Sequence, residues 1–93
     1  MSYYVVLCNV DMYFYNNTTN ENPISPELKS KMKEIKNLKV RSAYVDTVEA
    51  TYGVYDLVVR MKSENIEDMR ELTTWKLRRI QGIKSTITLP TVE

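Results

Sequence analysis

Short apolar runs alternate along the chain with segments in which apolar residues recur at helical spacing. The first run, Tyr3 to Val10, is rich in β-branched and aromatic residues, which predicts a strand. Both of its alternating sets of side chains are mostly apolar, so neither face of this strand is expected to lie open to water. One face would carry Tyr4, Val6, Cys8 and Val10, and the other Tyr3, Val5, Leu7 and Asn9.

Two later segments have the helical pattern. The first is expected to begin at the N-cap residue Ser25, continue through Pro26, and end at Asn37. The second is expected to begin at Asn65, with Asp68 three residues on in an arrangement like a capping box. The apolar stripes predicted for the two helices are Leu28, Met32 and Ile35 in the first, and Ile66, Met69, Leu72, Thr73, Leu77 and Ile80 in the second.

Three further strands are predicted. Residues Val40 to Thr51 read as one long strand of mixed character that contains a bulge. Gly53 supplies a turn, and the segment Tyr55 to Met61 follows with a clean alternation of apolar residues. Residues Lys84 to Leu89 form the last strand, which Pro90 ends. The segment Asp11 to Ile24 is polar and rich in asparagine, which indicates a surface loop.

The resulting order βαββαβ predicts an α+β fold of the ferredoxin-like type, with a four-stranded antiparallel sheet and two helices on one face. The other sheet face has no helix to cover it. It is expected to carry Val58 with either Val6 and Cys8 or Val5 and Leu7. Because an exposed apolar sheet face of this size indicates an interface, we expect a homodimer that pairs through its sheets, as a dimeric α+β barrel.

The length of 93 residues fits a single domain, residues 1–93, with one core. The longest apolar run is far too short to span a bilayer, and no targeting segment precedes it, so a cytoplasmic protein without membrane contact is expected. The single cysteine, Cys8, lies in an apolar strand and is expected to pack as a small hydrophobic side chain.

The composition also limits the chemistry. The chain has no histidine, which excludes His-based catalysis and the usual zinc and haem sites, and it has two glycines, too few for a phosphate-binding loop. We therefore expect no enzyme, no metal and no cofactor. The net charge is +1, and aromatic residues are not interleaved with the basic ones, so direct nucleic-acid binding is not expected.

Two motifs carry a resemblance to a known family. Residues 48–60 (VEATYGVYDLVVR) contain a Gly-x-Tyr-Asp turn, and residues 80–89 (IQGIKSTITL) are similar to a closing pattern of the type I-x-G-V-x-S/T-x-T. In this order and within the βαββαβ layout, they resemble the effector domain of the Lrp/AsnC family of transcription regulators. The resemblance covers residues 40–90, whereas the first strand and helix fit by position alone.

The resemblance implies a regulatory module that binds a small effector, expected to be an amino acid. It also implies dimers that assemble further, often into octamers, and a full-length Lrp/AsnC regulator as a partner. Family members usually carry a DNA-binding helix-turn-helix, which is missing here, so the chain resembles a stand-alone effector domain. The effector-binding residues implied are Tyr52, Gly53, Tyr55, Asp56, Thr86 and Thr88.

These roles suit a zwitterion, since backbone N–H groups at the glycine turn would bind its carboxylate and Asp56 its ammonium. Alternatives stay open: Asp56 accepts backbone N–H bonds, and the threonines are ordinary strand residues. Tyr52 replaces the family's usual threonine, and Trp75 is either an interface anchor or a residue at the margin of the core. Two alternative functions are left for the whole chain. One is a structural assembly domain without ligand, and the other is a small cofactor-free enzyme of the dimeric ferredoxin-like type.

Overall fold

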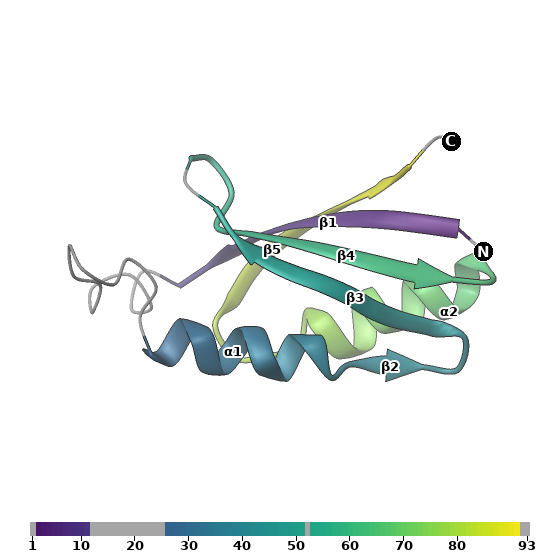
Figure 1. Ribbon diagram of the computed structural model, residues 1–93, viewed down its shortest axis with the longest axis horizontal. Coiled ribbons are helices and arrows are strands. Elements are labelled where there is room, and N and C mark those ends of the chain that lie inside the picture. The colour runs from purple at the N-terminus through teal and green to yellow at the C-terminus, as the bar shows by residue number, and fades with distance from the viewer. Residues whose placement is uncertain (1, 12–25, 52, 92–93) are drawn as a thin grey trace.

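A computed structural model describes residues 2–11, 26–51 and 53–91 of the chain. The expected N-cap Ser25, Tyr52 and nearly all of the loop from Asp11 to Ile24 lie outside these ranges. The sheet is antiparallel with strand order β2-β3-β4-β1-β5 (Figure 1). The elements are β1 (Ser2–Val10), α1 (Pro26–Lys36), β2 (Lys39–Val40), β3 (Ala43–Ala50), β4 (Leu57–Ser63), α2 (Ile66–Glu71), the π-helical segment η2 (Leu72–Leu77) and β5 (Ile83–Pro90).

The sheet has five strands, so the expectation of four was wrong. The segment expected as one long strand from Val40 is a hairpin in which the short β2 pairs with β3 around Arg41 and Ser42. Arg41 has a φ of 48°, which turns the chain back on itself. The other four strands lie in the order β3-β4-β1-β5, an arrangement compatible with a ferredoxin-like fold. The expected bulge is confirmed in β3, between Val45 and Thr47.

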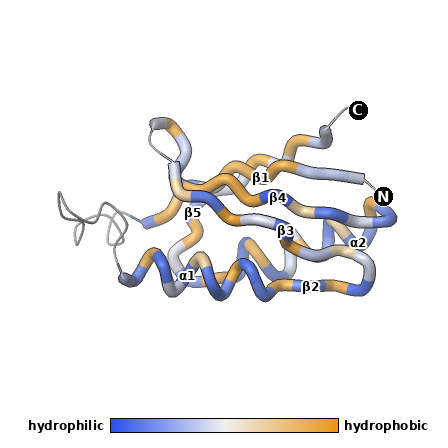
Figure 2. The backbone as a smooth tube through the Cα atoms, in the orientation of Figure 1, coloured by the Kyte–Doolittle hydropathy of each residue, from blue (hydrophilic) through white to orange (hydrophobic). Residues whose placement is uncertain are grey.

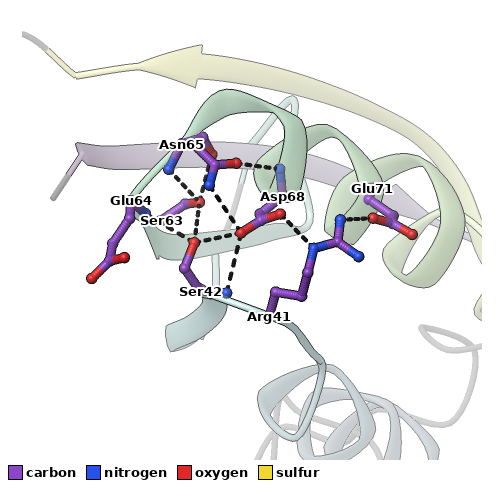
Figure 3. A network of polar contacts seen from close by, with 7 residues as sticks. All are labelled: Arg41, Ser42, Ser63, Glu64, Asn65, Asp68 and Glu71. Atoms are coloured by element: carbon purple, nitrogen blue, oxygen red, sulfur yellow. Dashed lines mark hydrogen bonds and ion pairs between the residues drawn. The ribbon is translucent and has the colours of Figure 1, made fainter.

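Contacts with side chains of α2 hold the Arg41–Ser42 turn in place (Figure 3). One carboxylate oxygen of Asp68 accepts hydrogen bonds from the Ser42 hydroxyl at 2.6 Å and from the Ser42 N–H at 3.2 Å. The other accepts from Arg41 Nε at 2.8 Å, and Arg41 also pairs with Glu71. The Asp68 N–H in turn donates to Asn65 Oδ1 at 2.9 Å, which confirms Asn65 as the N-cap of α2.

Both helical segments lie on one face of the sheet (Figure 1). The β1 residues that point toward them, Tyr4, Val6, Cys8 and Val10, are buried, together with alternate residues of β4 from Leu57 to Met61. From the helices, Leu28, Ile35, Met69, Leu72 and Leu77 complete this core. Hydrophobic residues accordingly gather in the middle of β1 and at the start of β4, and they are interspersed with hydrophilic ones along α1 (Figure 2).

The burial of the β1 side chains shows which of them face away from the helices. Val6 and Cys8 are fully buried in the core, so the open face carries Val5 and Leu7 beside Val58. Within the described ranges, no helix is long and apolar enough to cross a membrane.

Candidate functional site

The expected effector turn joins β3 to β4. Gly53 has a φ of +123°, and a Cβ added there would meet no atom within 4 Å, so backbone conformation rather than space requires glycine. The turn is closed by Thr51, whose hydroxyl donates to the Tyr55 carbonyl at 2.7 Å. Gly53 is exposed and Tyr55 is half-buried. The position of Tyr52 is not described.

Asp56 fastens this turn to the end of β1. Its backbone N–H donates to the Cys8 carbonyl at 2.9 Å, and its Oδ2 accepts a hydrogen bond from the Val10 N–H at 2.8 Å. The carboxylate thus has the structural role of satisfying a backbone donor, one of the two alternatives raised by the sequence. Because a carboxylate offers about four lone-pair positions, this bond leaves Asp56 able to accept from a ligand as well.

Thr86 and Thr88 lie on β5, across β1 from the turn. They pair with Cys8 and Val6, and like these residues they face the helical side of the sheet. Asp56 and Thr86 therefore flank Cys8 on opposite sides, about two strand spacings or 10 Å apart. In the described part of the chain no hydrogen bond connects either threonine with the turn. The structure thus brings Gly53, Tyr55 and Asp56 together, and places the threonines in a separate setting.

That setting is a groove between β5 and the segment α2–η2. Its volume is about 320 Å³, and its walls combine threonine hydroxyls, two arginines and apolar side chains. The sequence reasoning did not single out Arg70, Thr74 and Arg78, which line it from the helical side. The signal was present, since Ile66, Arg70, Thr74 and Arg78 recur every four residues along one side of the helix.

The open sheet face is the second feature that the sequence predicted. Val5 and Leu7 of β1 lie beside Val58 of β4 and beside Ile87 and Leu89 of β5. Ile87 and Leu89 remain 44% and 45% exposed. Five aliphatic side chains on adjacent strands form a continuous apolar surface, which we call the open-face patch.

Charged residues border the open-face patch along β3 and β4. Arg60 approaches Glu49 at 3.9 Å, and Lys62 approaches Asp46 at 3.8 Å. The Lys62 ammonium also lies 5.0 Å from the centre of the Tyr3 ring. An apolar centre with a polar rim is typical of protein interfaces.

Two other side chains raised by the sequence can now be placed. Cys8 is fully buried, and burial raises the pKa of its thiol to about 12, so it stays protonated at neutral pH and is a poor nucleophile. Trp75 lies on the outer side of η2, is 55% exposed, and stacks with Arg79 at 4.4 Å. Among the described residues, no cluster of His, Cys, Asp and Glu side chains could hold a metal ion.

Comparison with known proteins gives a structural likeness only. No family model matches the chain, and no curated protein matches it significantly. A hypothetical protein from Pyrococcus horikoshii has the same fold, with a TM-score of 0.72 and 18% identity over 100% of this chain and 92% of that one. The crystal structure of FFRP-DM1 gives a TM-score of 0.66 at 20% identity, covering 99% of this chain and 100% of that one.

A longer protein, MtbAldR, matches with a TM-score of 0.73 at 12% identity, over 99% of this chain and 52% of its own. These structural neighbours are Lrp/AsnC-family proteins. At such low identity the likeness establishes a shared fold.

Proposed function

We propose that this chain is a non-enzymatic regulatory module of the Lrp/AsnC effector-domain type, which dimerises through its open sheet face and binds an amino acid at the Gly53–Asp56 turn. The observation that carries the proposal is the open-face patch, an apolar sheet surface on the side opposite the helices. The fold shared with Lrp/AsnC regulators supports it, as do the two sequence motifs in residues 48–60 and 80–89.

Dimerisation would cover the patch with a second copy. A chain of this length has a small core and therefore a thin stability margin, to which the burial of further apolar surface would add. An interface of ordinary size buries roughly 800 Å² on each partner, and the patch with its charged rim is suited to that. The turn lies at one end of the sheet, where dimers assembled into larger oligomers, or a full-length regulator, could share it.

The effector chemistry rests on the turn itself. The backbone at Gly53 is exposed and in a conformation that only glycine adopts readily, so it can approach a ligand carboxylate closely. Asp56 would receive the ammonium group in a charge-assisted hydrogen bond, in addition to the Val10 N–H that it already binds. The half-buried ring of Tyr55 would form one wall. Tyr52 remains part of the proposal as a second wall, whereas Thr86 and Thr88 line a separate groove.

A thermal-shift screen with each amino acid at millimolar concentration tests the effector. Binding to the native state raises the melting temperature by mass action, so at least one amino acid should stabilise the chain. Asp56→Asn keeps the size of the side chain but removes the charge that the ammonium needs, and should abolish that shift. Asp46→Asn, on the rim of the sheet face, is the matched control and should keep it.

A structural assembly domain without ligand is the alternative. It predicts a dimer whose melting temperature no amino acid changes, and for which Asp56→Asn alters stability alone. That result would reject the effector half of the proposal while leaving the sheet-to-sheet dimer standing.

A further inference from the structure

The groove between β5 and α2–η2 has a composition that the proposed amino-acid site does not explain. Its walls come from the consecutive elements α2, η2 and β5, together with Tyr4 of β1. The polar side chains that line it are Arg70, Thr73, Thr74, Arg78, Thr86 and Thr88, and the apolar ones are Tyr4, Ile66, Met69 and Pro90.

Both arginines in this groove have their charge available for a ligand. Arg70 and Arg78 are exposed, and no ion pair in the described ranges involves either of them. This contrasts with Arg41, on the opposite side of α2, which is bound by two carboxylates. Guanidinium groups bind carboxylates and phosphates in two-pronged hydrogen bonds, and hydroxyl groups beside them add further donors.

The acid–base balance of the groove selects among ligands. None of the side chains lining it is acidic. A free amino acid would place its ammonium group near two guanidinium groups with no carboxylate to receive it, and like charges at such distances are repulsive. An anion that lacks an ammonium group fits the groove, whereas a zwitterion fits the turn at Asp56.

The local helix geometry is adapted to the groove. Residues Leu72–Leu77 form a π-helix, in which the Arg78 N–H donates to the Thr73 carbonyl at 3.0 Å, five residues back. The wider turn keeps Leu72 and Leu77 in the core while Thr74 and Arg78 line the groove. π-Helical turns are rare and occur frequently at functional sites, which is an observation independent of the charges.

We infer that this groove is a second ligand site, which binds a small organic anion with a carboxylate or phosphate group at Arg70 and Arg78 and an apolar body against Tyr4, Ile66 and Met69. The volume of about 320 Å³ falls at the lower end of the range for small-molecule sites. The site lies within one copy of the chain and does not depend on the effector site at the turn.

Titration of the ¹⁵N-labelled chain, followed by amide chemical shifts, tests this site with benzoate, phenyl phosphate and the uncharged benzyl alcohol. Benzoate and phenyl phosphate should bind saturably in the millimolar range and shift the amides of Thr73, Thr74, Thr86 and Thr88. Whichever of the two anions binds more tightly identifies the preferred group. Benzyl alcohol should bind at least about tenfold more weakly, since it cannot pair with the arginines.

Arg70→Gln and Arg78→Gln should each weaken anion binding by about tenfold or more, and the amide spectrum reports at once whether they fold. Arg79→Gln removes the same charge from the neighbouring position that stacks on Trp75, and should leave binding unchanged. Equal losses of anion affinity in Arg79→Gln and Arg78→Gln would overturn the inference. They would indicate that the anion is attracted by the overall positive charge rather than bound by the groove arginines. Shifts confined to other parts of the chain would also overturn it, as would binding of benzyl alcohol as tight as that of benzoate.

Discussion

Asp68 is the residue on which the β2–β3 turn depends. Hydrogen bonds from Ser42, and then from Arg41, lower the pKa of its carboxyl from 3.8 to about 2. A carboxylate whose pKa is lower in the folded than in the unfolded state contributes stability above its unfolded pKa, and this contribution is lost as the pH falls through the folded pKa. The stability due to Asp68 is therefore present above about pH 4 and declines toward pH 2.

We expect Asp68→Asn to remove this pH dependence. The asparagine has no proton to gain, so the difference in unfolding free energy between the original chain and Asp68→Asn should be largest at neutral pH and shrink toward pH 2. Urea unfolding at a series of pH values measures this difference. Glu67→Gln, at an exposed position of the same helical turn, is the matched control and should give a small difference at neutral pH. A constant difference for Asp68→Asn would contradict the assigned role of the carboxylate.

Gly53 provides a test of backbone conformation alone. Its φ of +123° is unfavourable for any side chain, whereas an added Cβ would lie in open space. Gly53→Ala should therefore destabilise the fold by about 1–3 kcal/mol without a steric clash, as measured by urea unfolding. Val54→Ala, at the 82% exposed neighbouring position, should change stability by less than about 0.5 kcal/mol. Equal effects of the two substitutions would show that the turn does not require glycine.

At the scale of elements, the segment from Ile66 to Leu77 shows how helix geometry distributes residues between core and surface. The α-helical part ends at Glu71, and the π-helical part places Leu72 and Leu77 in the core although they are five positions apart. Trp75 lies between them and points outward. The register of this segment therefore decides both the packing of the core and the lining of the β5 groove.

Two substitutions test that register. Leu77 is fully buried, so Leu77→Ala should cost about 2–5 kcal/mol of unfolding free energy through lost burial and the cavity that remains. Trp75→Ala removes a larger side chain from an exposed position and should cost less than about 1 kcal/mol. Chemical unfolding of both variants measures the contrast, and a reversed order would show that the segment is rotated relative to the structure described above.

The sequence predicted most elements because their signals are local. The apolar run of β1, the stripe of α1 and the N-cap at Asn65 each lie within a few residues, and each appears in the structure. The hairpin at Arg41–Ser42 was missed because no Gly, Pro, Asn or Asp marks the turn, and because the partner Asp68 lies 26 or 27 positions further along the chain. The π-helix was missed because the spacing of apolar residues fits an α-helix nearly as well.

The candidate site was predicted less completely than the fold. Gly53 and Asp56 form a local turn, and the structure keeps them together. Thr86 and Thr88 come from the closing motif, and only the pairing of β5 with β1 reveals that they face the helical side. The two groove arginines recur with Ile66 and Thr74 at every fourth position, but only the packing of α2 and η2 beside β5 reveals that this side of the helix lines a groove.

For the whole molecule, the open-face patch is the surface on which the proposed assembly depends. Ile87 lies on this patch and is 44% exposed, so a charge there remains solvated in a single copy but would be buried in a sheet-to-sheet dimer. Ile87→Glu should weaken dimerisation by more than about tenfold while the far-ultraviolet circular dichroism spectrum keeps its shape. Val54→Glu adds the same charge at the exposed β3–β4 turn and should leave the dimer intact.

Sedimentation velocity of the unmodified chain at micromolar concentration tests the central claim most directly. In the proposed assembly a second copy covers the apolar sheet face, so the chain should sediment as a dimer or as a larger multiple of dimers. A well-behaved monomer of 10.9 kDa throughout that concentration range would contradict the account.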